Sequence, residues 1–208
     1  MKKQITIGLI LLSFLFVGRI YAEISTKECT IYTQKNHSGL EEKEQLVTCS
    51  DGVMYSNGLY KFAIISLPPD WDTIHLNQRD PTEKGKIASL AFSPGDQPVL
   101  LHIIMKKTQN TSIEQELKEK IGLLENESGG FKLESEPAKA EIHKYETRKF
   151  IYSSDAFAKV ITYLILEKGF FYELNFACNT LDSYERYSGD FNKIINNILI
   201  GTEVNFAN

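Results

Sequence analysis

Residues 156–178 read AFAKVITYLILEKGFFYELNFAC, and this stretch decides the fold. Two runs rich in β-branched and aromatic residues flank the dipeptide Lys168-Gly169. Such a short connection joins antiparallel neighbours, because parallel strands need a much longer crossover. In the second run Glu173 and Asn175 fall on one face, and apolar residues alternate on the other. The stretch therefore predicts an antiparallel hairpin with one buried face, formed by Phe170, Tyr172, Leu174, Phe176 and Cys178.

Further strand patterns extend outward from this hairpin. A run over 139–152 precedes it across the short turn Ser153-Ser154-Asp155, which predicts a three-stranded antiparallel meander. The run over 99–105 is apolar at nearly every position, which is typical of a strand buried on both faces. Residues 68–72 predict a turn, because Pro68-Pro69 ends the strand before it, and 73–85 predicts a polar loop. The expected strands cover 59–67, 86–92, 99–105, 139–152, 156–167 and 170–178.

Two helices are predicted among these strands. The first begins after Ser112, which forms a capping box with Gln115, and ends at Gly129-Gly130. Its apolar stripe is Ile113, Leu117, Ile121 and Leu124, and its expected ion pairs are Glu114–Lys118 and Glu116–Lys120. The second helix covers 182–199 with an expected break at Gly189, and its buried face is Phe191, Ile194, Ile195 and Ile198. The order of elements predicts an α+β fold with a mainly antiparallel sheet and helices packed on it.

The N-terminus has the three-part layout of a secretory signal peptide. A basic start precedes an apolar run of thirteen residues, and Ala22 offers a cleavage site. That run is shorter than the roughly 20 residues that span a bilayer, so residues 1–22 are expected to be a cleaved leader. Loss of Lys2, Lys3 and Arg19 from the 23 basic residues leaves 20, against 27 acidic ones, for a net charge of −7. The sequence predicts an exported protein, periplasmic or secreted, that does not span the membrane after cleavage.

Export changes the interpretation of the three cysteines. Cys29 and Cys49 are expected to form a disulfide in an oxidising compartment, within a hairpin that forms an N-terminal extension over 23–52. The loop of about 20 residues that it closes corresponds to roughly 3 kcal/mol in the chain-entropy model. Cys178 is expected to be a small buried residue, and a reactive or partner-linked thiol is the alternative.

Two segments resemble a family of exported domains. Residues 60–71, YKFAIISLPPDW, place a strand before an aromatic-Pro turn, and the aromatic strand 170–176 runs into the C-terminal helix. This arrangement is similar to the PsbP-like and DcrB-like proteins over about 53–200, followed by a flexible tail at 201–208. The resemblance implies an α/β/α sandwich. It also implies a non-enzymatic role as an accessory subunit, chaperone or envelope protein, and it carries over no set of functional residues.

Candidate binding residues gather after the Pro-Pro turn. Asp70, Asp72, His75 and Asp80 supply carboxylates and an imidazole, which are ligands for a divalent metal, although their spacing matches no calcium loop. An acidic, solvated loop is the alternative. Trp71 is expected to cover the end of the sheet, with a role in partner contact as its alternative. His102, in the apolar run 99–105, is expected to be packed and hydrogen-bonded.

These features lead to three hypotheses about function. The first is an exported, non-enzymatic accessory protein that contacts a protein partner in the cell envelope. The second is a periplasmic carrier or sensor that binds a metal or small molecule through the loop 70–80. The third, a hydrolase with an unusual site, has the least support because no catalytic signature is present. Nucleic-acid binding is not expected of an acidic chain, and no cofactor is predicted.

Overall fold

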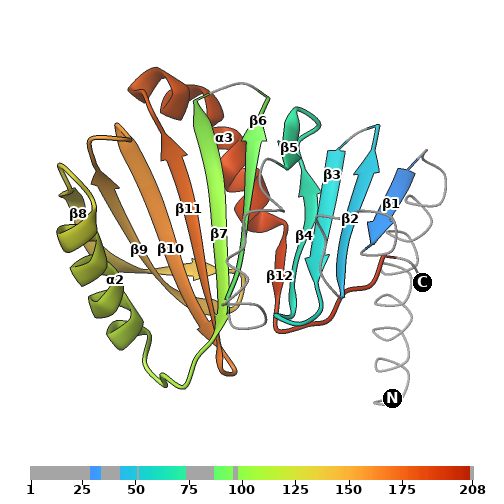
Figure 1. The fold of residues 1–208 in the computed structure, drawn as a ribbon, viewed down its shortest axis with the longest axis horizontal. Helices are drawn as coiled ribbons and strands as arrows, with labels where there is room; N and C mark the ends of the chain where they lie inside the picture. Colours follow the sequence, from blue (N-terminus) through green and yellow to red (C-terminus); the bar gives the residue numbers. More distant parts are fainter. Residues whose placement is uncertain (1–28, 34–42, 51, 74–86, 96–97, 207–208) are drawn as a thin grey trace, which may run out of the picture.

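The computed structural model describes residues 29–33, 43–50, 52–73, 87–95 and 98–206. These residues form two antiparallel sheets and the helices α2 and α3 (Figure 1). The five-stranded sheet has the order β1 (Cys29–Thr33), β2 (Glu44–Cys49), β3 (Gly52–Asn57), β4 (Phe62–Leu67) and β12 (Ile198–Ile200). The seven-stranded sheet has the order β5 (Trp71–Thr73), β6 (Ile87–Pro94), β7 (Val99–Lys107), β11 (Phe170–Cys178), β10 (Lys159–Glu167), β9 (Tyr145–Ser153) and β8 (Lys132–Ile142).

The two helices pack on different faces of the seven-stranded sheet. Helix α2 (Ile113–Glu127) lies on β9 and β10, above a small apolar cluster. Helix α3 (Leu181–Asn196) contacts β11, β7 and β4, and it shares the larger core with the inner faces of both sheets. The mainly antiparallel α+β class is therefore as predicted. The expected α/β/α sandwich is not confirmed, because a second sheet shares one face with α3.

The aromatic strand β11 forms the centre of the larger core. The rings of Phe176 and Phe191 stack with centroids 4.5 Å apart and nearly parallel planes. Phe62 on β4 stacks on Tyr172 on β11 and so joins the two sheets. The hydroxyl of Tyr172 also donates a hydrogen bond of 2.7 Å to the carbonyl oxygen of Tyr60. These contacts follow from the alternation in β11, which directs every second side chain into the core.

Several predicted strands differ from those in the structure. The single strand expected over 139–152 is wrong, because the chain turns at His143-Lys144 and His143 adopts a positive φ of 52°. The short strands β3 and β12 were not predicted, and Trp71 begins the strand β5 where a turn was expected. In β7 alternate residues are only half-buried, so the expectation of burial on both faces is also wrong.

Both helices differ in detail from the prediction. Ser112 caps α2 by accepting a hydrogen bond from the backbone N–H of Glu114, while the side chain of Gln115 bonds to Glu119, so the capping box is not formed. The predicted end of α2 is confirmed, and Gly130 takes the left-handed conformation with φ 66°. Helix α3 continues through Gly189 without a break.

The two ends of the described chain meet in the five-stranded sheet. Strand β1 pairs with β2 from Cys29 opposite Cys49, which confirms the predicted hairpin, although its turn lies outside the described residues. Strand β2 also pairs with β3 along its length, so the hairpin continues the five-stranded sheet, and the N-terminal extension over 23–52 stays a prediction. In the segment predicted as a flexible tail, the side chain of Gln45 donates a hydrogen bond to Asn205 and accepts one from the backbone N–H of Phe206.

Candidate functional site

The loop predicted to bind a metal is only partly described. Asp70 and Asp72 are exposed, whereas His75 and Asp80 lie outside the described residues. Within the described ranges, no group of three His, Cys, Asp or Glu side chains could hold a metal ion. Among the residues that the structure describes, no ligand set for the second hypothesis is brought together, and the predicted metal site stays a prediction.

Trp71 lies in the core and not on the surface. Its side chain is 1% exposed, and its ring contacts those of Phe176 and Tyr187. This burial is what a residue that packs against the end of the sheet requires. Its role in partner contact stays a prediction.

The cysteines divide as predicted. Cys29 and Cys49 form a disulfide between β1 and β2. Cys178 is fully buried, and burial raises the pKa of its thiol to about 11, with Lys159 as a smaller opposing influence. A thiol of this pKa is neutral at physiological pH, and only the thiolate is strongly nucleophilic. Cys178 is therefore a packing residue in the folded protein.

His102 is packed and hydrogen-bonded as predicted, although it is half-buried. Its Nε2 lies 2.6 Å from the hydroxyl oxygen of Ser89 on the neighbouring strand β6. A serine beside a histidine could suggest nucleophilic catalysis, but acyl transfer also needs backbone N–H donors directed at the developing oxyanion. His102 lies on β7 between β6 and β11, where backbone donors bond to the neighbouring strands, so this arrangement favours a structural role for the pair.

Helix α2 is held to the sheet by ion pairs that cross between elements. Glu116 is 2% exposed, and its carboxylate meets the amine of Lys106 at 2.7 Å. It also accepts hydrogen bonds of 2.7 Å from Thr108 and 2.9 Å from Asn110. Burial alone would raise the pKa of Glu116, but the hydrogen bonds from these three residues and the charge of Lys106 together lower it below its ordinary value. The predicted intrahelical pair with Lys120 is replaced by this contact.

The carboxylate of Glu116 is expected to make the free energy of unfolding depend on pH. Because the pKa is lowered in the folded state, Glu116 stabilises the fold above its ordinary pKa, and this contribution is lost as the pH falls through the folded pKa. We expect Glu116→Gln to lower the free energy of unfolding by about 2 kcal/mol at pH 7, and by less at pH 3. Urea denaturation at both values measures this. Glu119→Gln, an exposed change in the same helix, is the control, and an equal loss at both pH values would contradict the prediction.

Two further ion pairs fix α2 in place. Lys120 meets Glu173 on β11 at 2.6 Å, and Asn175 donates a hydrogen bond to the same carboxylate. Arg148 on β9 is nearly buried, and its Nε donates to Glu114 on α2 at 2.6 Å. Arg148 also reaches Glu146 on its own strand at 3.0 Å. One guanidinium group therefore joins the helix to the β8–β9 hairpin.

The β8–β9 hairpin bends from one side of the molecule to the other. Its base lies beside α2, and register shifts at Leu133/Ser135 and Ser135/Ala138 mark bulges in β8. Bulges bend a strand, and Figure 1 shows the hairpin crossing toward β12. At its end Tyr145 donates a hydrogen bond to the carbonyl oxygen of Ile200, and Ile142 enters the larger core.

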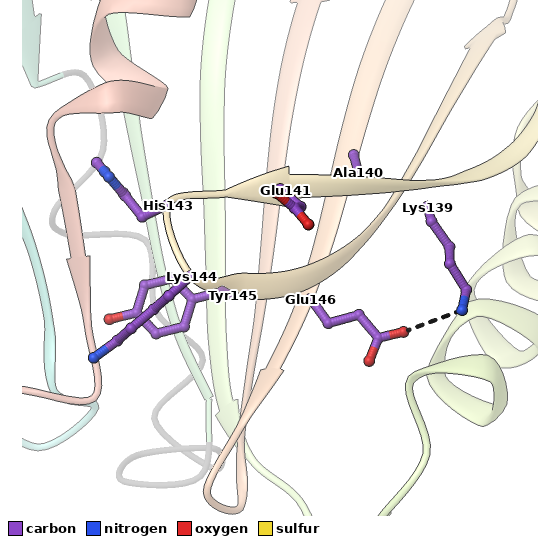
Figure 2. A pocket seen from close by; sticks show the side chains of 7 residues that line it. All are labelled: Lys139, Ala140, Glu141, His143, Lys144, Tyr145 and Glu146. Carbon is purple, nitrogen blue, oxygen red and sulfur yellow. Dashed lines mark ion pairs between the residues drawn. The ribbon is translucent and has the colours of Figure 1, made fainter.

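The outer face of the hairpin end carries a hollow of about 590 Å³, which we call the hairpin hollow. Figure 2 shows its side chains on both strands and at the turn. The amine of Lys139 lies 3.9 Å from the carboxylate of Glu146, and both side chains are mostly exposed. Its lining residues are Lys139, Ala140, Glu141, His143, Lys144, Tyr145 and Glu146.

The hairpin hollow was not predicted from the sequence. Residues 139–146 lay inside an expected strand and match no catalytic or metal motif. A signal was nevertheless present, because His143 and Lys144 interrupt the alternation between Ile142 and Tyr145 with two adjacent polar residues. A pair of polar residues between two alternating runs is typical of a hairpin turn.

Comparison with known proteins places the fold in a known class. No family model and no curated protein matches the chain. The solution structure of cyanobacterial PsbP (CyanoP) from Synechocystis sp. PCC 6803 matches with a TM-score of 0.51 and 9% identity, over 71% of this chain and 91% of that one. The fold is therefore PsbP-like, as the sequence predicted.

Two further solved structures also match, with TM-scores of 0.49 and 0.44. LpqN of Mycobacterium tuberculosis, described as involved in cell envelope biogenesis, is 19% identical over 67% of this chain and 82% of that one. PA94 of Pseudomonas aeruginosa, a protein of unknown function described as a putative regulator, is 12% identical over 63% of this chain and 90% of that one. In the part of the chain that the structure describes, no helix is long and apolar enough to cross a membrane.

Proposed function

We propose that the protein is an exported, non-enzymatic accessory protein of the cell envelope that binds a protein partner. The PsbP-like fold is the starting point of this proposal. The observation that carries the proposal is the end of the β8–β9 hairpin, with its hollow of about 590 Å³ and exposed charged side chains. Packing of the core does not require a hollow at this exposed end of the hairpin. Exposed charges around a concave surface suit a polar protein–protein contact.

The disulfide supports the proposed location. Disulfides persist in oxidising compartments and are rare in the cytosol, so the Cys29–Cys49 bond favours export. The predicted leader over 1–22 agrees with this, although it lies outside the described residues. The destination predicted from the sequence is the periplasm or the exterior of the cell.

The exposed edge of the larger sheet favours contact through side chains. Strand β8 is an edge strand and would be the obvious place for a partner to add a strand. It contains Pro137 and the exposed acids Glu134 and Glu136, and its register is shifted twice. Each of these features discourages backbone pairing at an edge. We therefore place the partner at the hairpin hollow and not along the strand.

Native mass spectrometry of the protein from its own envelope fraction, after mild chemical cross-linking, tests the proposal. We expect a second protein at fixed stoichiometry, bound to a chain of residues 23–208 with two hydrogens missing at Cys29 and Cys49. An added mass of only tens to hundreds of daltons would favour the carrier hypothesis instead. A bare monomer in the cross-linked and uncross-linked samples would contradict the proposal.

A further inference from the structure

Strand β1 lies at the end of the five-stranded sheet and is its least buried strand. Its residues Cys29–Thr33 pair with β2 along their whole length, and Figure 1 shows β1 at the outer end of the sheet. None of the five residues of β1 is buried, whereas all six residues of β3 are buried. Burial of apolar surface therefore holds β1 less firmly than the strands further inside the sheet.

The disulfide lies at one end of the ladder between β1 and β2. Cys29 and Cys49 are directly opposite each other, so the covalent bond joins the outermost strand to its neighbour. Both residues are half-buried, and a thiol reductant can therefore approach their sulfur atoms. The fully buried Cys178 does not share this accessibility. A covalent bond thus holds the strand for which burial contributes least.

Strand β1 also covers apolar side chains of β2. Tyr32 packs against the larger core and lies opposite Leu46, a residue of that core that is 5% exposed. Val47, on the other face of β2, is 1% exposed. Departure of β1 would uncover part of this apolar surface, and it would leave β2 as the edge of the sheet.

Strand β2 has attachments that do not depend on β1. It pairs with β3 from Cys49 opposite Gly52 to the other end of both strands. The buried carboxylate of Glu44 accepts hydrogen bonds of 2.7 Å from Tyr55 and from Asn57, both on β3. These contacts hold β2 in the sheet when β1 leaves, so they confine an opening to the pairing between β1 and β2.

We propose that the Cys29–Cys49 disulfide is a redox latch on β1, and that its reduction detaches residues 29–33 from β2 while the rest of the fold stays intact. The reductant is a dithiol. One of its thiolates attacks a sulfur atom of the disulfide, which forms a mixed disulfide and releases the other cysteine. Its second thiol then displaces the remaining cysteine. The disulfide gains two electrons and two protons, and the dithiol loses them and becomes a disulfide.

The latch determines which strand forms the edge of the five-stranded sheet. In the oxidised protein that strand is β1, and in the reduced protein it is β2, whose backbone groups facing β1 lose their partners. Exposed backbone groups of an edge strand are a template for pairing with another chain. The redox state thus changes the surface of this sheet. The inference goes beyond the proposed function and does not depend on the hairpin hollow.

Hydrogen–deuterium exchange of the oxidised protein, before and after treatment with dithiothreitol, tests the inference. In the oxidised protein we expect protection of the amides of 29–33 that bond to β2. After reduction these amides should exchange within about threefold of the rate of an unstructured peptide, while β7 and β11 stay protected by at least about a hundredfold. Binding of a dye that fluoresces on apolar surfaces should increase with the same time course.

Two variants isolate the contribution of the disulfide. The double variant Cys29→Ser, Cys49→Ser should show rapid exchange over 29–33 without a reductant and no response to dithiothreitol. Cys178→Ala keeps the disulfide and removes the third thiol, so it should respond to dithiothreitol as the wild type does. If the double variant does not fold, the reduced wild type and Cys178→Ala still carry the test.

Three outcomes would overturn the inference. Retained protection of 29–33 after complete reduction would mean that the bond acts only on the unfolded chain. A rise in exchange by the same factor in every strand would indicate a general loss of stability and no local opening. A disulfide that dithiothreitol reduces only in denaturant would be inaccessible in the folded protein. None of these outcomes bears on the proposed accessory role, which the cross-linking experiment tests separately.

Discussion

The Phe176→Ala variant is expected to lose about 3–5 kcal/mol of its free energy of unfolding, the largest effect that we predict. The ring of Phe176 is fully buried and stacks on Phe191, and it also contacts Trp71 and Tyr184. Its removal leaves a cavity between β11 and α3. The neighbouring strands are hydrogen-bonded to one another, so they cannot move to close it. Trp71 is the only tryptophan, so its fluorescence during urea denaturation follows this region of the core.

Leu123→Ala is the control for this core substitution. Leu123 is 52% exposed on α2, so its truncation should change the free energy of unfolding by no more than about 0.5 kcal/mol. A loss below about 1 kcal/mol for Phe176→Ala would mean that the stacked rings do not form the centre of the core.

Loss of the Cys29–Cys49 disulfide is expected to cost about 3 kcal/mol, because the bond closes a loop of about 20 residues in the unfolded chain. The double variant Cys29→Ser, Cys49→Ser should show this loss in urea denaturation without a reductant. Dithiothreitol should produce the same loss in the wild type and no further loss in the variant. An unchanged denaturation midpoint after complete reduction would contradict the prediction.

Counting thiols checks the same assignment independently. The folded, oxidised protein should expose no reactive thiol, since Cys178 is fully buried and its pKa is raised to about 11. Denaturant alone should expose one thiol, and denaturant with a reductant three. Two or more thiols in the denatured, unreduced protein would show that Cys29 and Cys49 are not paired.

The sequence predicted elements whose signals are local. Strand β11 was predicted with the bounds that the structure shows, Phe170–Cys178, because its alternation and its two-residue connection lie within a few residues of each other. The start of α2 after Ser112 also follows from a local capping preference. The PsbP-like fold could be recognised from the order of such elements, without any catalytic motif.

Elements that depend on distant partners could not be predicted. Ile198 fits the apolar stripe of α3, and it belongs to β12 only because it pairs with Ile64 on β4. Glu116 was expected to pair along its own helix, and its actual partner, Lys106, lies on β7. The hairpin hollow was missed for a related reason, since its two opposed acids become neighbours only when β8 and β9 pair in this register.

The closure of the five-stranded sheet by the last residues bears on the timing of folding. Strand β12 completes that sheet beside β4, and Gln45 bonds to Asn205 across a sequence separation of 160. A chain that crosses a membrane from its N-terminus cannot form these contacts until its C-terminus has emerged. Contacts between residues far apart in the sequence also slow folding. The distant segments must first come together, at a cost in chain entropy, before their pairing can stabilise the fold. If the chain is exported as proposed, the five-stranded sheet is completed only after residues 198–206 have crossed the membrane.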